Sequence, residues 1–95
     1  MYSISSQLYE ETARRLRDAI GGRSYFSGSL DFVFEDTECR LTLSAVIYTS
    51  RREMPEGAIT VIDDIVPVWW EFRTSDENGE MLNDFSFSAL KELFA

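Results

Sequence analysis

Ile65-Val66-Pro67-Val68-Trp69-Trp70-Glu71-Phe72 is the most apolar stretch of the sequence, and it contains both tryptophans. Its uninterrupted apolar part, 65–70, is too short to cross a membrane and too continuous for a strand with one face in water. Other parts of the chain are therefore expected to cover this strand. Neighbouring residues of a strand point to opposite faces, so Trp69 and Trp70 are predicted to lie on opposite sides of the sheet.

The strand that contains this stretch is predicted to span 58–74 and to bend. Asp63 and Asp64 interrupt its apolar sequence, and Pro67 has no backbone N–H to donate to a neighbouring strand. A bulge, a kink or an edge position is therefore expected between Ile62 and Val68.

Two further strands precede it in the sequence. Apolar and polar residues alternate over 25–35 and again over 39–48, which is the pattern of strands with one buried face. The polar segment 35–38 between them predicts an antiparallel hairpin. Residues 50–57 have no periodicity and contain a proline and a glycine, so they are predicted to form a loop.

A helix is predicted at the start of the chain, from Ser3 to Ile20. Apolar residues recur there at helical spacing, Ser3 is the expected N-cap, and Gly21 is expected to end the helix. Two i,i+4 ion pairs are expected on its surface, Glu10 with Arg14 and Glu11 with Arg15. The arginines of this region are interpreted as a solvated helix face.

The last part of the chain is predicted to contain a turn over 75–79 and a helix over 87–94, capped by Asn83, Asp84 or Ser86. Residues 80–85 between them either form a short fourth strand or belong to this helix. The predicted fold is a two-layer α+β domain over residues 1–95, in the order α-β-β-β-(β)-α. Its antiparallel meander of three or four twisted strands carries the N-terminal and C-terminal helices on one face.

The net charge of −8 favours some partners over others. The first 23 residues hold four arginines and three acidic residues, which leaves five basic and fourteen acidic groups, a balance of −9, for residues 24–95. Nucleic-acid binding is not expected, because such binding depends on Lys and Arg neutralising phosphates. A basic protein is the partner that this charge favours.

The sequence also indicates a compartment. Cys39 is the only cysteine and has no partner for an internal disulfide, which favours the cytoplasm. The residues that follow Met1 resemble neither a signal peptide nor a membrane anchor, so no membrane association is expected.

Few catalytic mechanisms fit this composition. Histidine is absent, there is one cysteine, and the glycines do not have the spacing of a phosphate-binding loop. We therefore expect neither an enzyme nor a protein with a cofactor or a metal. The carboxylates Asp63, Asp64 and Glu71 are interpreted as an acidic rim beside the apolar strand.

An aromatic face of the sheet is the predicted binding surface. Its candidate residues are Trp69, Trp70, Tyr48, Tyr25, Val46 and Val33. Large aromatic residues grouped on an otherwise polar sheet face are typical of interfaces. The predicted function is a small acidic protein-interaction or regulatory module, with a protein partner or a second copy as a homodimer. Two alternatives stay open: a loop or the C-terminal segment covers this face as ordinary core, or a pocket between sheet and helices serves a small ligand or a carboxylate-dependent enzyme.

Overall fold

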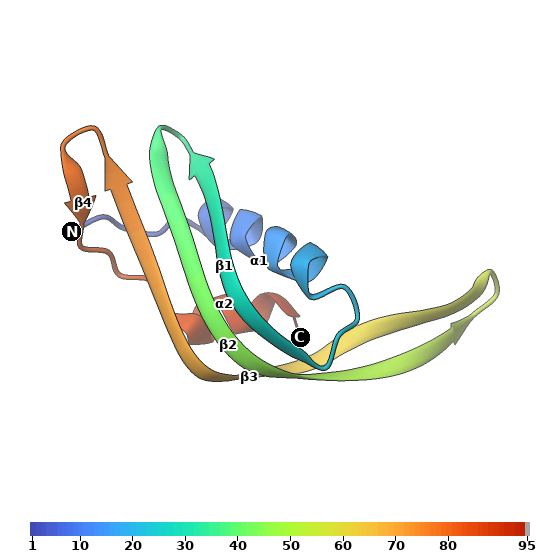
Figure 1. Ribbon diagram of the computed structural model, residues 1–95. Coiled ribbons are helices and arrows are strands. Elements are labelled where there is room, and N and C mark those ends of the chain that lie inside the picture. Colours follow the sequence, from blue (N-terminus) through green and yellow to red (C-terminus); the bar gives the residue numbers. More distant parts are fainter. Residues whose placement is uncertain (95) are drawn as a thin grey trace.

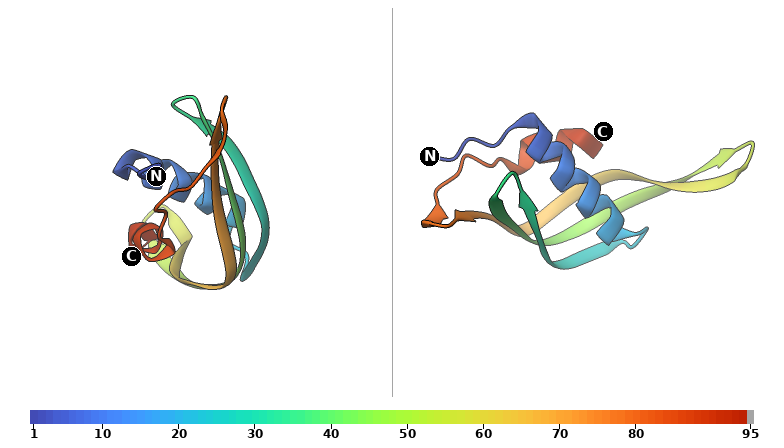
Figure 2. Two further views of the ribbon diagram at one scale, coloured as in Figure 1. Left: turned by 90° about the vertical axis from the view of Figure 1, so that its left-hand side faces the viewer. Right: turned by 90° about the horizontal axis from the view of Figure 1, so that it is seen from above.

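The computed structural model describes residues 1–94 and has the predicted two-layer α+β architecture (Figure 1). The elements are α1 (Ser6–Ile20), β1 (Tyr25–Phe34), β2 (Thr37–Met54), β3 (Gly57–Asp76), β4 (Gly79–Met81), α2 (Phe87–Lys91) and the 3₁₀ helix η1 (Glu92–Phe94). The strands form one antiparallel meander in the order β1-β2-β3-β4. Both α-helices lie on the same side of the curved sheet (Figure 2).

Helix α1 begins later than predicted. Ser5, not Ser3, is the N-cap, and its side chain accepts a hydrogen bond from the Leu8 backbone N–H. Gly21 ends the helix with a left-handed φ of 54°, as expected. The predicted Glu10–Arg14 pair is replaced, because Arg14 contacts Glu11 and Asp18 instead.

The hairpin between β1 and β2 turns over two residues. Glu35 and Asp36 have φ values of 46° and 66°, which matches the positive values that a tight hairpin turn of type I′ requires. Thr37 and Glu38 were predicted to lie in the turn, but they already pair with Phe34 and Val33.

The predicted loop over 50–57 is wrong, because these residues belong to a long β-hairpin. Strands β2 and β3 stay paired from Thr49 opposite Ile62 to Met54 opposite Gly57, with a two-residue turn at Pro55 and Glu56. Figure 1 shows this hairpin extending well beyond the helices, and its residues 50–60 are exposed. Because neither face is buried, the sequence has no reason to alternate between apolar and polar residues. We call residues 49–62 the arm.

The bend predicted between Ile62 and Val68 is confirmed as two bulges. The register of β2 and β3 shifts between Ser44 and Ala45, where Val68 is the extra residue, and between Tyr48 and Thr49, where Asp63 is the extra residue. Each bulge reverses which residues of β3 face the helices. The bulge at Val68 therefore determines which face of the sheet each of Trp69 and Trp70 occupies.

The fourth strand is shorter than the range 80–85, since β4 ends at Met81. Beyond it, Asn83 forms an isolated bridge with Tyr2, and its side-chain amide donates to the Phe72 backbone carbonyl at 3.0 Å. Ser86, one of the three predicted caps, accepts a hydrogen bond from Ala89 N and begins α2.

The core lies between the sheet and the helices. Its buried apolar residues come from α1 (Leu8, Ala13, Leu16, Ile20), from the strands (Phe26, Phe32, Cys39, Leu41, Leu43, Ala45, Ile47, Ile65, Phe72) and from the C-terminal segment (Phe85, Phe87, Leu90, Phe94). Within residues 1–94, no helix is long and apolar enough to cross a membrane.

Candidate interaction surface

The two tryptophans lie on opposite faces of the sheet, as predicted. Trp70 pairs with Leu43 and faces the helices, and its ring centroid is 5.5 Å from that of Phe85 and 6.0 Å from that of Phe87. Trp69 pairs with Ser44 on the outer face. The exposed fraction is 37% for Trp70 and 52% for Trp69.

An apolar surface surrounds Trp69 on the outer face, and we call it the Trp69 patch. It consists of Tyr25, Val46, Tyr48, Val66, Val68 and Trp69, all of them exposed. The strand register makes it continuous, because Tyr25, Val46 and Val66 form one row across β1, β2 and β3. Both α-helices lie on the opposite face, so among residues 1–94 the C-terminal segment does not cover the patch (Figure 2).

The structure divides the six predicted binding residues. Tyr25, Val46, Tyr48 and Trp69 lie together in the Trp69 patch, whereas Trp70 lies on the helix side. Val33 is on the outer face but pairs with Glu38 at the far end of the sheet. Val66 and Val68 also belong to the patch. They could have been predicted only if the position of the bulge had been known.

Polar side chains occupy the outer face beyond the patch. The hydroxyls of Ser27 and Ser44 lie 3.1 Å apart, and those of Ser29 and Thr42 lie 2.9 Å apart. These hydroxyl pairs satisfy one another across β1 and β2. They give the Trp69 patch a definite border on one side.

Charged pairs follow toward the far end of the outer face. The guanidinium Nε of Arg40 lies 2.6 Å from an Asp31 carboxylate oxygen, and that of Arg73 lies 2.6 Å from Glu71. Glu71 was predicted to belong to an acidic rim, but its charge is balanced by Arg73. This end of the outer face therefore carries paired charges of both signs.

Asp63 and Asp64, at the base of the arm, have separate partners. Asp63 accepts a hydrogen bond from the Ser50 hydroxyl at 3.0 Å. Asp64 lies 3.0 Å from the Lys91 ammonium, and this hydrogen bond, followed by one from the Ile65 backbone N–H, lowers the pKa of the Asp64 carboxyl. The two carboxylates do not converge with Glu71 into one site.

The acidic and cysteine side chains of the described residues are dispersed. Residues 1–94 contain no group of three or more Asp, Glu, Cys or His side chains placed to hold a metal ion. A cavity of about 280 Å³ lies between Asp63, Asp64 and the C-terminal helices, and neither tryptophan lines it. Cys39 is buried in the core, where desolvation raises the pKa of its thiol to about 11 and keeps it protonated.

Comparisons with family models, curated protein sequences and solved structures give no match to this chain.

Proposed function

We propose that this chain is a non-enzymatic interaction module that binds a protein partner through the Trp69 patch. The supporting observation is a continuous apolar surface on three adjacent strands, which no described segment covers. Trp and Tyr side chains contribute most to the affinity of protein interfaces, because they bury a large area at a small cost in entropy. Trp69, Tyr25 and Tyr48 would be the main anchors.

The charge of the chain supports a basic partner. A net charge of −8 attracts a basic protein over a distance of about one Debye length, roughly 8–10 Å, and accelerates its encounter with the patch. The apolar residues would then provide the short-range binding energy. The cytoplasm is the proposed compartment, because the only cysteine is a buried, reduced thiol.

The test is a pull-down with the immobilised chain, comparing the wild type with Trp69→Ala. We expect the variant to lose the bound partner and to keep its fold, because the Trp69 side chain lies outside the core. Val33→Ala is the matched control, since Val33 is an exposed apolar residue of the same face outside the patch. Equal recovery of every bound protein with Trp69→Ala and with the wild type would contradict the proposal.

A further inference from the structure

Strand β1 is an open edge of the sheet, and its hydrogen-bonding pattern shows which backbone groups are available. Tyr25 pairs with Val46, so Ser24 lies opposite Ile47, whose N–H donates to the Ser24 carbonyl at 2.8 Å. Ser24 and Ile47 are therefore a hydrogen-bonded pair. Such pairs alternate in an antiparallel ladder, so even-numbered residues of β1 bond to β2. The odd-numbered residues direct their N–H and C=O groups away from β2; they are Tyr25, Ser27, Ser29, Asp31 and Val33.

The opposite edge of the sheet is protected against another strand. Over its open length, β3 contains Pro67 and two bulges, at Asp63 and Val68, and the Asn83 side chain already binds the Phe72 carbonyl. Proline, bulges and charges are the usual devices that prevent edge-to-edge pairing.

Strand β1 has fewer of these devices. It contains no proline and no register shift, and its only charged residue, Asp31, is paired with Arg40. Outside the arm, the β1 edge is therefore the long edge that can accept another strand.

We propose that a second copy of this chain pairs with β1 through its own β1, antiparallel and with a two-fold axis at Ser29. In this register Ser29 faces Ser29 of the other copy, Ser27 faces Asp31, and Tyr25 faces Val33. It is the only antiparallel register that pairs all of the outward-directed residues with one another. The two four-stranded sheets would join into one continuous sheet.

The same register accounts for the exposed side chain of Val33. Val33 is 64% exposed and lies far from the Trp69 patch of its own chain. In the dimer it would lie beside Tyr25 of the other copy, at the border of that copy's patch. Cross-strand pairs of this kind stabilise antiparallel strands by about 0.2–1 kcal/mol.

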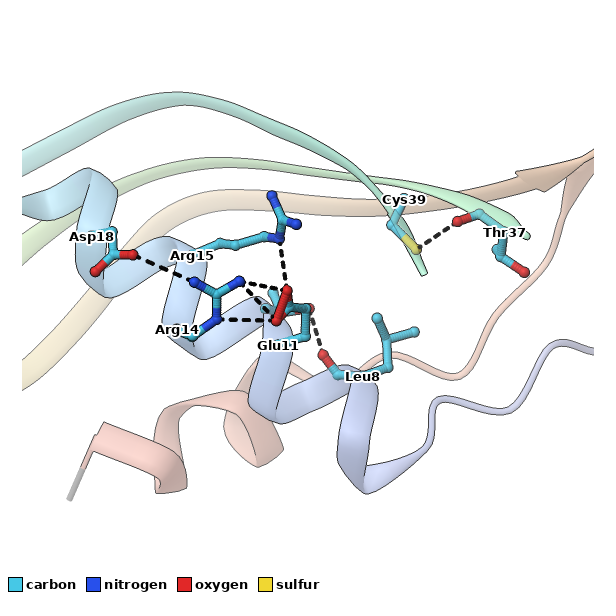
Figure 3. Close-up of polar contacts among 8 residues, drawn as sticks. Leu8, Glu11, Arg14, Arg15, Asp18, Thr37 and Cys39 are labelled. Carbon is cyan, nitrogen blue, oxygen red and sulfur yellow. Dashed lines mark hydrogen bonds and ion pairs between the residues drawn. The ribbon is translucent and has the colours of Figure 1, made fainter. Parts of the chain in front are cut away.

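Charges of both signs lie beside the β1 edge. A groove of about 340 Å³ separates the edge from α1, and it is lined by Arg14, Arg15, Asp18, Ser29, Leu30 and Asp31. Figure 3 shows Arg14, Arg15 and Asp18 together on one side of the helix, around Glu11. Because two basic and two acidic residues line the groove, each copy would offer both signs of charge to the other.

The first test measures the molecular mass in solution by sedimentation equilibrium, from micromolar to millimolar chain. We expect a dimer for the wild type and a monomer for Ser29→Pro, which removes one outward N–H and leaves the bonds to β2 in place. Ser29→Ala, which keeps the N–H, is the matched control and should stay dimeric. Circular dichroism shows whether Ser29→Pro folds. If Ser29→Pro does not fold, Ser29→Lys takes its place in the test, because this substitution puts two like charges opposite each other across the axis.

Three results would overturn the inference: a monomeric wild type at every concentration, a folded Ser29→Pro variant that stays dimeric, or a dimer that dissociates with Trp69→Ala and not with Ser29→Pro. The last result would place the second copy on the outer face instead. The proposed function does not depend on the β1 edge, so either proposal can fail alone.

A disulfide cross-link tests the position of the axis. Hydrogen-bonded antiparallel pairs have Cα atoms about 5.5 Å apart, which is within the range of disulfides. We expect diamide to oxidise two Ser29→Cys thiols to one intermolecular disulfide, while the buried Cys39 stays reduced. Ser44→Cys, on the same face of the central strand, should give no such dimer. A cross-link with Ser44→Cys and none with Ser29→Cys would exclude the proposed axis.

Discussion

Trp70 lies on the helix side of the sheet, at the border of the core, where water still reaches it. Its ring packs against Phe85 and Phe87, but 37% of the residue is exposed. We expect Trp70→Ala to lower the free energy of unfolding by about 2–3 kcal/mol, below the ~3–5 kcal/mol typical of fully buried aromatic residues. Trp69→Ala, on the other face, should cost less than about 1 kcal/mol. Urea denaturation followed by circular dichroism compares the two variants, and equal losses would contradict their assignment to different faces.

The Asp64–Lys91 ion pair makes a pH-dependent contribution to stability. Lys91 and the Ile65 N–H lower the pKa of the folded Asp64 carboxyl from its ordinary value of 3.8. A carboxyl with a lowered folded pKa stabilises the fold above its unfolded pKa, and this contribution is lost as the pH falls through the folded pKa. We expect Asp64→Asn to melt at a slightly lower temperature than the wild type at neutral pH, because exposed pairs contribute little.

This difference in melting temperature should shrink as the pH falls below 3.8, and it should disappear once the pH lies below the lowered pKa of the folded Asp64 carboxyl, because the carboxyl is then protonated in both states. Lys91→Met is the control, since it removes the same pair from the other side and should show the same pH dependence. A difference between wild type and Asp64→Asn that persists in acid would show that the asparagine side chain itself perturbs the bulge.

Helix α1 depends on one serine among several near its start. Ser5 caps the helix through the Leu8 N–H, so Ser5→Ala should lower the free energy of unfolding by about 1 kcal/mol. Ser3→Ala should leave it unchanged. Urea denaturation of the two variants measures this contrast, and a larger loss for Ser3→Ala would contradict the observed helix start.

The sequence could not decide between these serines, because Ile4 continues the helical spacing of the apolar residues. Contacts distant in the sequence decide it instead: Tyr2 N donates to the Leu82 carbonyl, and Ile4 N donates to the Asp84 carboxylate. These bonds hold residues 2–4 extended along the C-terminal segment. The helix therefore starts only after them.

Most of the arm lies outside the core. None of residues 50–60 is buried. We expect replacement of residues 51–60 by Asn-Gly, between the paired Ser50 and Val61, to change the free energy of unfolding by less than about 1 kcal/mol. Urea denaturation tests this expectation. A variant that fails to fold would show that the arm stabilises the core through contacts at its base.

The sequence predicted the layers and the order of the elements, because the alternating and helical spacing of apolar residues reflects which faces are buried. The arm was missed for the same reason, since a ribbon without a buried face leaves no such pattern. The face of each tryptophan also depended on a single extra residue, Val68, in a bulge. A bulge changes which residues of a strand point to each face without changing the composition of the strand, so the Trp69 patch could be predicted only in part.

The overall form of the chain is elongated, with extents of 50 × 26 × 18 Å, because the arm extends from one side of the two-layer body (Figure 1). The body itself has helices on one face only. The core between the sheet and the helices supplies the stability, and the opposite side of the sheet, which carries the Trp69 patch, stays open.

The bridge between Tyr2 and Asn83 bears on the order in which the protein folds. Residues at the two ends of the sequence are joined there, and Tyr9 adds a further link by accepting a hydrogen bond from the Ser86 N–H through its hydroxyl. Closing such distant contacts is slow, because the chain must first lose the entropy of the intervening residues. During synthesis, the strands of the meander are complete before residues 82–86 exist. The contacts of α1 and residues 2–4 with the C-terminal segment are thus expected to be among the last to form, after the hairpins of the meander.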